Sequence, residues 1–177
     1  MAEKETFKLG YTGPALENHE MDVKDLAPAL LSIGELFENS NRILNGEKVK
    51  ISVNIKATRA GSVDVLLSVA QDFTSQAKTL FSGQEITAIV NAHTILNILG
   101  IGVGGSGLIG LIKWLKNRQI QNITTLSTGD LKIELQDGDA RVVNEKEIKL
   151  FGFIHIRKNI EAIINTPLKK TGVDSVK

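Results

Sequence analysis

Glycine is the residue type in this chain whose spacing most resembles a chemical site. The stretch from Gly100 to Gly110 contains three overlapping matches to the G-x-G-x-x-G pattern, which lets a backbone approach the phosphates of a dinucleotide. That fingerprint must follow a strand and open a helix, whereas the residues before these glycines have helical apolar spacing. Overlapping matches of this kind reflect glycine content, so we do not predict a dinucleotide-binding βαβ unit.

A weaker ligand site remains at the start of the helix that follows the glycines. The first turn of a helix exposes backbone N–H groups without intrahelical partners, and these groups can hold a phosphate. On this hypothesis an oligomer of the chain sequesters a small anionic, nucleotide-like ligand. The residues assigned to the site are Gly104, Gly105, Ser106, Gly107 and Lys113.

The other residue types that carry chemistry form no recognisable catalytic or metal-binding pattern. His93 has no second ligand three or four residues away, and His19 lies in an acidic stretch that is more typical of a solvated loop. The sequence contains no Ser-His-Asp order, no H-E-x-x-H motif and no cysteine. We therefore expect a non-enzymatic protein without a cofactor or a metal ion.

The same glycines lie in the most apolar stretch of the chain, Ile95–Trp114. Its hydropathy is in the range of transmembrane candidates, Trp114 is placed like an interfacial aromatic, and basic residues follow it. Burial in the core of an oligomer explains the same composition, because a helix that is apolar all round is a buried one. In either case the contact residues would be Leu96, Ile98, Leu99, Leu108, Ile109, Ile112 and Trp114.

Capping signals divide this apolar stretch into two helices. Ser82 and Glu85 form a capping box that predicts a helix from residue 83 to Leu99, and Ser106 can cap a second helix from Gly107 to Gln119. Neither helix is long enough to span a bilayer comfortably alone. The stretch is therefore interpreted as a helical hairpin whose partner is either lipid or another copy of the chain.

A second candidate surface is the polar face of the strand predicted at Lys48–Arg59. Apolar and polar residues alternate along this strand, which predicts one buried and one solvated face. A basic sheet face can bind nucleic acid, but this face lacks the aromatic residues that stack on RNA bases. A net charge of +1 also argues against a dedicated nucleic-acid-binding protein. The basic residues of this face are Lys48, Lys50, Lys56 and Arg59.

The order of the predicted elements gives an α+β fold. A strand at Thr6–Gly13, a helix at Leu26–Asn45 capped by Asp25, and strands at Lys48–Arg59 and Ser62–Gln71 make an N-terminal βαββ arrangement, a helix on an antiparallel sheet. Asp72 would then cap a short helix over residues 73–82. The predicted segments are residues 1–71, the βαββ domain; residues 72–119, with the glycine-rich hairpin; and residues 120–177, a β-hairpin with C-terminal helices.

The last segment carries its own turn and cap signals. Asp137-Gly138 predicts a type I′ hairpin between two short strands. Asn144 predicts the cap of a final helical region, which runs in two pieces around Gly152 and ends near Pro167. The closing residues read like the start of a strand, so we expect the natural chain to continue. The N-terminus has no apolar signal region, which predicts a cytoplasmic protein that can associate with the inner face of the membrane.

Several blocks together resemble a family of uncharacterised bacterial and prophage-type proteins. The blocks are GPALENHEMDVKDLAPALL near the N-terminus and GLIGLIKWLK after the glycines, and the resemblance extends over nearly the whole chain. The family has no established activity, so the resemblance implies no catalytic residue. It implies a chain that continues further and a setting in phage–host conflict, as defence or anti-defence. Together these observations favour a non-enzymatic, self-associating protein, with the anionic-ligand and nucleic-acid hypotheses as alternatives.

Overall fold

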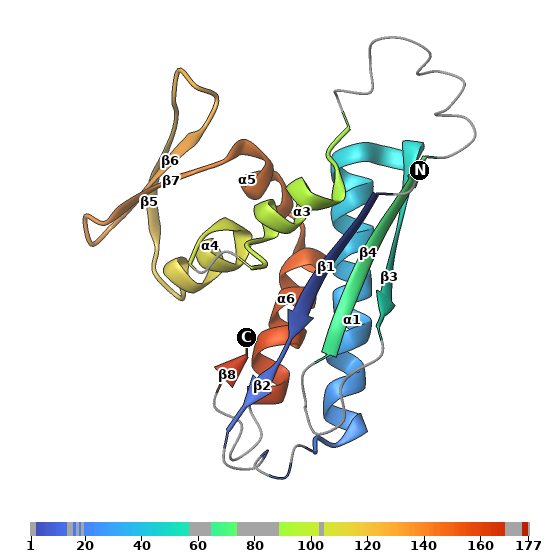
Figure 1. The fold of residues 1–177 in the computed structure, drawn as a ribbon. Coiled ribbons are helices and arrows are strands. Elements are labelled where there is room, and N and C mark those ends of the chain that lie inside the picture. Colours follow the sequence, from blue (N-terminus) through green and yellow to red (C-terminus); the bar gives the residue numbers. More distant parts are fainter. Residues whose placement is uncertain are drawn as a thin grey trace. The chain divides into compact units, whose positions relative to one another are not determined.

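The computed structural model describes residues 3–13, 16, 18, 20–56, 65–73, 89–102, 105–168 and 175–176. The chain divides into two compact units, Met1–Ala92 with His155–Lys177, and His93–Ile154. Each unit combines helices with antiparallel strands, which confirms the predicted α+β class (Figure 1). The division into three consecutive segments stays a prediction.

The first unit is built on a three-stranded antiparallel sheet with a long helix on its inner face (Figure 1). β4 lies in the centre and pairs with β1 on one side and β3 on the other. The helix α1 contacts β3, and the rings of Phe7 and Phe37 lie 5.5 Å apart between β1 and this helix. This is the predicted βαββ arrangement. Its elements are β1 (Glu3–Leu9), α1 (Val23–Asn45), β3 (Val49–Ile55) and β4 (Val65–Phe73).

Alternation along the strands gives the sheet its two faces, as predicted. Val65, Leu67 and Val69 of β4 are buried on the inner face, and Val49 of β3 is buried beside them. On the outer face of β4, Leu66 and Asp72 are exposed, whereas Ser68 and Ala70 are buried. The predicted strand positions from residue 57 to residue 64 lie outside the described residues.

The helix α1 differs from its predicted bounds at the N-terminus. Asp22 is the N-cap, and its carboxylate accepts a hydrogen bond of 2.9 Å from the backbone N–H of Lys24. Asp25, the predicted cap, lies in the first turn, where a negative charge is favourable to the helix dipole. Pro28 lies inside the helix. At the other end, Gly46 is the C-cap, with φ of 64° and ψ of −147°.

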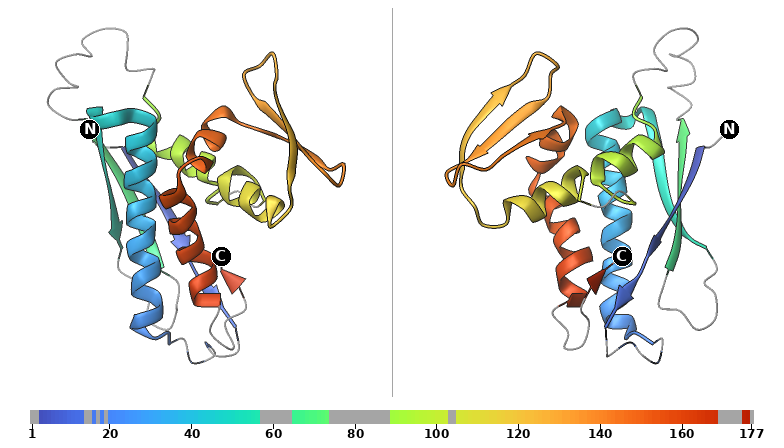
Figure 2. Two further views of the ribbon diagram at one scale, coloured as in Figure 1. Left: turned by 180° about the vertical axis from the view of Figure 1, so that it is seen from behind. Right: turned by 60° about the vertical axis from the view of Figure 1, so that its left-hand side comes forward.

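The helix α6 (Ile154–Leu168) lies beside α1 in the first unit, as both views of Figure 2 show. Its isoleucines Ile156, Ile160 and Ile163 have helical spacing and are buried, so they form one apolar stripe. Asn159 on the same helix donates a hydrogen bond of 2.8 Å to the carboxylate of Glu35 on α1. Two further elements of this unit are the short strands β2 (Tyr11–Thr12) and β8 (Ser175–Val176), which pair with each other.

A buried group of side-chain amides holds the chain at Val90 against the end of α1. Asn45 accepts a hydrogen bond of 2.7 Å from the Val90 N–H and donates one of 2.8 Å to its carbonyl. Gln71 on β4 donates a second hydrogen bond, of 2.9 Å, to the same carbonyl. Because Asn45 and Gln71 are less than 10% exposed, these bonds satisfy polar groups that are withdrawn from water.

The second unit consists of helices and a three-stranded antiparallel meander in the order β5-β6-β7. The predicted hairpin is present as β6 and β7, and α4 contacts α5. β5 was not predicted, because its sequence IQNITT has no regular apolar alternation. The elements are α3 (Ala92–Leu99), α4 (Gly107–Leu115), β5 (Ile120–Thr125), β6 (Leu131–Leu135), β7 (Ala140–Val143) and α5 (Glu145–Phe151).

The turn between β6 and β7 is not the predicted type I′ turn. Gly138 has φ of 89°, but Asp137 is not among the residues with positive φ, which a type I′ turn requires at both central positions. The N–H of Leu135 donates to the carbonyl of Asp139 at 2.8 Å, and the N–H of Gly138 donates to the carbonyl of Leu135 at 3.0 Å. This is a three-residue loop with glycine in the left-handed position.

Other predicted bounds in this region were also wrong. β4 continues through Phe73, so Asp72 lies in a strand and caps no helix. Residues 89–91 are not helical and α3 begins only at Ala92, while residues 74–88 lie outside the described residues. α4 ends at Leu115 instead of Gln119. By contrast, Asn144 caps α5 as predicted, accepting a hydrogen bond of 2.8 Å from the N–H of Lys146.

Candidate functional site

The glycine-rich segment is a corner in which α3 and α4 approach each other closely within the second unit. A Cβ atom on Gly100 would lie 2.1 Å from the carbonyl oxygen of Ser106, and one on Gly107 would lie 2.3 Å from the backbone nitrogen of Gly100. On Gly110, a Cβ would lie 2.3 Å from the carbonyl oxygen of Gly105. These atoms are all backbone, so no side-chain movement can make room. Packing within one chain therefore requires these glycines.

The predicted anion site lies in this corner, and part of it is buried. Gly107 and Leu108, at the start of α4, are buried, and Gly107 lies against the backbone of Gly100. Ser106 occupies the N-cap position, but its side chain makes no capping hydrogen bond. Lys113 is exposed, and Gly104 lies outside the described residues. Of the residues assigned to the site, Gly107 is thus used in packing, Gly105 is exposed and Ser106 is half-buried. The ligand hypothesis stays a prediction.

Most of the residues predicted to contact a partner are buried within the single chain. Leu99 and Leu108 have no exposed surface, and Leu96 and Ile98 are 6% and 7% exposed. Ile109, Ile112 and Trp114 are half-buried. Most of these apolar side chains are consequently buried within the chain. They leave less exposed apolar surface for contact with lipid or with another copy.

The helices of this stretch are short. α3 has 8 residues and α4 has 9. Within the part of the chain that the structure describes, no helix has both the length and the apolar character needed to cross a bilayer. Membrane association and a cytoplasmic location stay predictions.

Trp114, predicted as an interfacial aromatic, is held by the loop between β6 and β7. Its indole N–H donates a hydrogen bond of 2.9 Å to a carboxylate oxygen of Asp139. Arg118 donates to the same oxygen at 2.9 Å and to Asp137 at 3.2 Å, while its guanidinium lies 5.0 Å from the centre of the Trp114 ring. Hydrogen bonds from Arg118 and Trp114 lower the pKa of Asp139. This cluster joins the end of α4 to the meander.

The uncovered strand β5 is the most distinctive exposed feature of the second unit. It forms one edge of the meander, and all six of its residues are exposed. Ile120 and Ile123 are 38% and 48% exposed, although their cross-strand partners Leu135 and Ile133 are fully buried or nearly so. The apolar face of the meander is therefore covered under β6 and open under β5.

The edge at β5 also lacks charge. No Asp, Glu, Lys or Arg occurs between Arg118 and Asp130. Folded proteins usually protect an edge strand with charged side chains, proline, a bulge or a short length, because its outer backbone groups can pair with another strand. β5 has one irregularity, between Ile120 and Asn122, and then an unbroken run to Thr125. It has no charge or proline to oppose pairing.

The edges of the other sheet and the opposite edge of the meander are protected in the usual way. β1 carries Lys4 and Lys8, and β3 carries Lys50. β7 has only 4 residues, includes Arg141, and is followed at once by the cap of α5. Among the edge strands of the two described three-stranded sheets, β5 is thus the one without a charged side chain.

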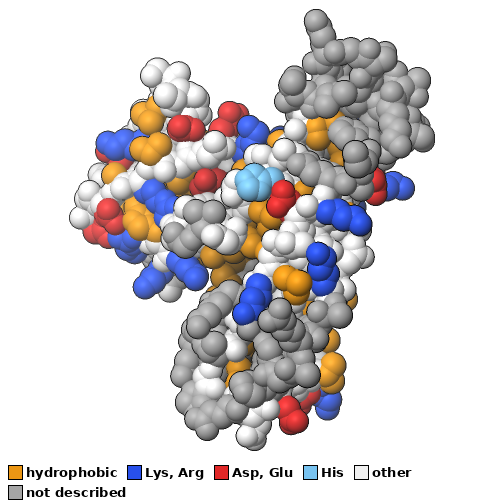
Figure 3. All heavy atoms as spheres, viewed as in Figure 1, with side chains coloured by type: hydrophobic (Ala, Val, Ile, Leu, Met, Phe, Trp, Pro, Cys, Tyr) orange, Lys and Arg blue, Asp and Glu red, His pale blue; other side chains and the backbone are white. Residues whose placement is uncertain are grey.

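The predicted basic face is present in part. Lys50 and Lys56 are exposed on the outer side of the first sheet, whereas Lys48 lies in the 3₁₀ turn η2 (Gly46–Lys48) that precedes β3. Arg59 lies outside the described residues. Sequence reasoning missed the lysines Lys4 and Lys8 of β1, which pairing through β4 places on the same face. Figure 3 shows several Lys and Arg side chains, in blue, over the strands of this unit.

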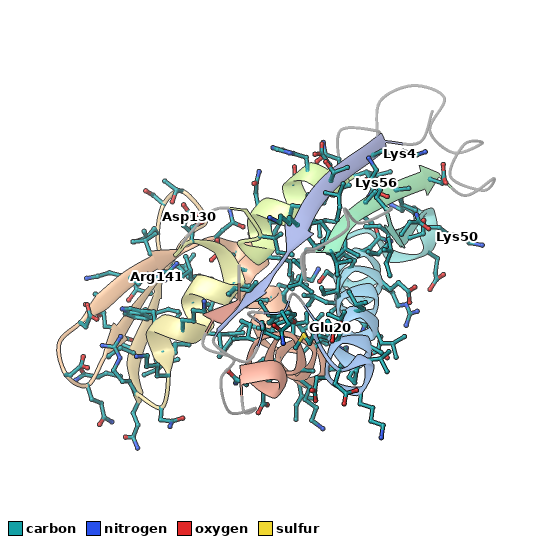
Figure 4. All side chains as sticks on the ribbon, turned by 60° about the horizontal axis from the view of Figure 1, so that its bottom comes forward. Lys4, Glu20, Lys50, Lys56, Asp130 and Arg141 are labelled. Carbon is teal, nitrogen blue, oxygen red and sulfur yellow. The ribbon has the colours of Figure 1, made fainter. Side chains whose placement is uncertain are left out.

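One half-buried carboxyl group in the second unit has a perturbed pKa. Burial raises the pKa of Glu147 on α5; nearby Arg141 opposes this effect and Asp130 adds to it. Arg141 and Asp130 are labelled in Figure 4. The guanidinium of Arg141 also donates a hydrogen bond of 3.2 Å to the carbonyl of Gly105. The group ties α5 and β7 to the glycine corner, and we assign it no chemistry.

Two further searches, for a metal-binding cluster and for related proteins, gave no other candidate site. The described residues contain no group of three or more histidine and acidic side chains that could hold a metal ion. Comparisons with protein-family models, with curated proteins and with solved structures gave no match. The resemblance to a prophage-type family stays a prediction.

Proposed function

We propose that this chain is a non-enzymatic, self-associating protein whose copies join through β5. One observation carries the proposal: β5 is an uncharged edge strand whose six residues are all exposed, and it lies beside an uncovered part of an apolar face. Self-association was also expected from the sequence, but we now propose β5 as the contact surface in place of the helical hairpin. The helical hairpin of Ile95–Trp114 is largely used within the chain, whereas β5 is not.

A second copy of the same chain is the partner that β5 fits best. Antiparallel pairing of two β5 strands about a two-fold axis would join two three-stranded meanders into one six-stranded sheet. The strand has no charge, so self-pairing places no like charges opposite each other. The pairing would also reduce the exposure of Ile120 and Ile123 in both copies.

The size of this contact sets the expected affinity. Two strands of 6 residues bury less surface than the roughly 1,200 Å² of a stable, specific interface. We therefore expect a dissociation constant on the order of micromolar, and a dimer whose population depends on concentration.

Sedimentation velocity over a range of concentrations tests the proposal on the full chain. The wild type should move from monomer to dimer as concentration rises, and Ile123→Lys should remain monomeric, because lysine is a common protecting residue on edge strands. Val142→Lys is the matched control. Val142 is 55% exposed against 48% for Ile123, and it lies on the same sheet but not on β5.

Two results would overturn the proposal. A wild type that stays monomeric at several hundred micromolar, roughly a hundredfold above the expected dissociation constant, would exclude this association. A dimer that Val142→Lys dissociates as fully as Ile123→Lys would place the contact elsewhere on the chain.

A further inference from the structure

The outer face of the first sheet carries lysines in two rows. Lys4 and Lys8 lie on β1, opposite Ala70 and Leu66 of β4. Lys50 lies on β3, opposite Asp72, and Lys56 extends the same strand through a hydrogen bond of 2.7 Å from its N–H to the carbonyl of Leu66. All four side chains are exposed, and Figure 4 labels three of them.

A neutral polar strip lies between the two rows. Thr6 on β1 and Asn54 on β3 both pair with Ser68 of the central strand, and Ser52 pairs with Ala70. Thr6, Ser52 and Asn54 are exposed and offer hydroxyl and amide groups, whereas Ser68 is buried. Such groups bind phosphate oxygens in many nucleic-acid complexes. Among the described residues of this face, Asp72 is the one acidic side chain, so the face has a local excess of positive charge despite the net charge of +1.

We infer that this face binds the phosphate backbone of a nucleic-acid duplex without sequence preference. The two rows stand on strands separated by one central strand, a distance of about 10 Å. Long lysine side chains on such rows can reach phosphates on both strands of a duplex across a groove about 6 to 12 Å wide. A single strand presents one line of phosphates and would engage one row.

The same face is less suited to other occupants. The described residues of this face include no aromatic side chain for base stacking, which favours backbone contacts over recognition of unpaired bases. Leu66, 38% exposed, is its one exposed apolar residue with a large side chain among those described. Stable membrane attachment requires an apolar anchor or lipid modification in addition to basic charge. A duplex needs only the charge and the polar groups that are present.

Salt dependence gives the size of the expected effect. Each lysine–phosphate contact contributes a slope of about −0.9 to the dependence of log affinity on log salt concentration. Four contacts therefore predict a loss of affinity of roughly 100-fold between about 50 mM and about 200 mM salt. A variant with three of these lysines replaced by glutamine retains one contact and should lose only about 3- to 4-fold over the same interval.

The experiment compares two triple variants of the full chain by fluorescence anisotropy with a labelled mixed-sequence duplex of about 20 base pairs. One variant combines Lys4→Gln, Lys50→Gln and Lys56→Gln on the proposed face. The control combines Lys113→Gln, Lys146→Gln and Lys149→Gln, which are exposed in the second unit. Both variants lower the net charge by three, from +1 to −2.

The outcomes separate a specific face from a general charge effect. The inference predicts that the first variant loses at least 10-fold in affinity at about 50 mM salt and flattens the salt slope, while the control stays within about 3-fold of the wild type. Equal losses in both variants would overturn it. So would binding to vesicles that contain anionic lipid but not to the duplex, or an affinity for a single strand equal to that for the duplex.

Discussion

Replacing Gly110 by alanine distinguishes packing within the chain from the other reasons for a glycine-rich helix. In an ordinary helix interior this substitution stabilises by about 1 kcal/mol, because glycine loses more backbone entropy on folding than alanine does. In α4 the new Cβ would lie 2.3 Å from the carbonyl oxygen of Gly105 and 2.6 Å from its carbonyl carbon. We therefore expect Gly110→Ala to destabilise the folded chain instead of stabilising it.

The magnitude follows from the displacement that this contact requires. Ordinary contact begins at 3.4 Å, so the backbone at Gly105 or the start of α4 must move by roughly 1 Å, and overpacking of this kind costs about 1–3 kcal/mol. The same carbonyl accepts a hydrogen bond from Arg141, whose loss adds about 1 kcal/mol. Subtracting the helix-propensity gain leaves a net destabilisation of about 1–3 kcal/mol.

Urea denaturation followed by far-ultraviolet circular dichroism and by the fluorescence of Trp114 measures this change. Trp114 is the only tryptophan of the chain and lies in the same unit as Gly110. Gly34→Ala is the control, because a Cβ on Gly34 in α1 meets no atom within 4 Å. That variant should be more stable than the wild type by up to about 1 kcal/mol. If Gly110→Ala were also stabilising, the glycine corner would not explain this residue.

Three further predictions test other parts of the structure. Asn45→Ala should lower the free energy of unfolding by about 2–3 kcal/mol, because the buried Val90 N–H loses its partner and the Val90 carbonyl keeps only the hydrogen bond from Gln71; a loss below about 1 kcal/mol in urea denaturation would contradict this. Burial raises the pKa of Glu147, so between its unfolded and folded pKa values the folded state binds more protons and stability falls as pH rises. Glu147→Gln should remove this fall and be more stable than the wild type at pH 7, and identical pH profiles of stability would refute it. Because Arg118 and Trp114 lower the pKa of Asp139, the fluorescence of Trp114 should titrate below the ordinary range for aspartate, and Arg118→Gln should raise the midpoint; an unchanged midpoint would show that Arg118 does not set it.

The α+β class and the βαββ arrangement could be predicted because their signals are local and repeated. Strict alternation from Val49 to Ile55 gives a strand with two unlike faces, and the apolar spacing along α1 gives a helix with one buried stripe. The cap at Asn144 and the break at Gly152 were predicted for the same reason. Each depends on residues that are close in sequence.

The two surfaces on which the functional proposals rest could not be predicted from the sequence, because they form through strand pairing between distant residues. β5 was not predicted, because an exposed edge strand does not need apolar alternation. The lysines of β1 join those of β3 only through the register of β4, which connects residues about 60 positions apart in the chain. The glycines gave a strong composition signal, but composition could not distinguish close approach within one chain from contact with lipid or with a second copy.

Single-cysteine cross-linking tests most directly whether β5 pairs with a second β5. The chain has no cysteine of its own, so each of Asn122→Cys, Ile123→Cys and Thr124→Cys introduces a unique thiol on the strand, and Val142→Cys introduces one on the same sheet away from it. A disulfide requires Cα atoms within about 7 Å of each other, which only residues near a two-fold axis satisfy. We predict a covalent dimer on mild oxidation for at least one β5 variant and none for Val142→Cys. Failure of all three β5 variants to cross-link, or equal cross-linking of Val142→Cys, would contradict the proposed association.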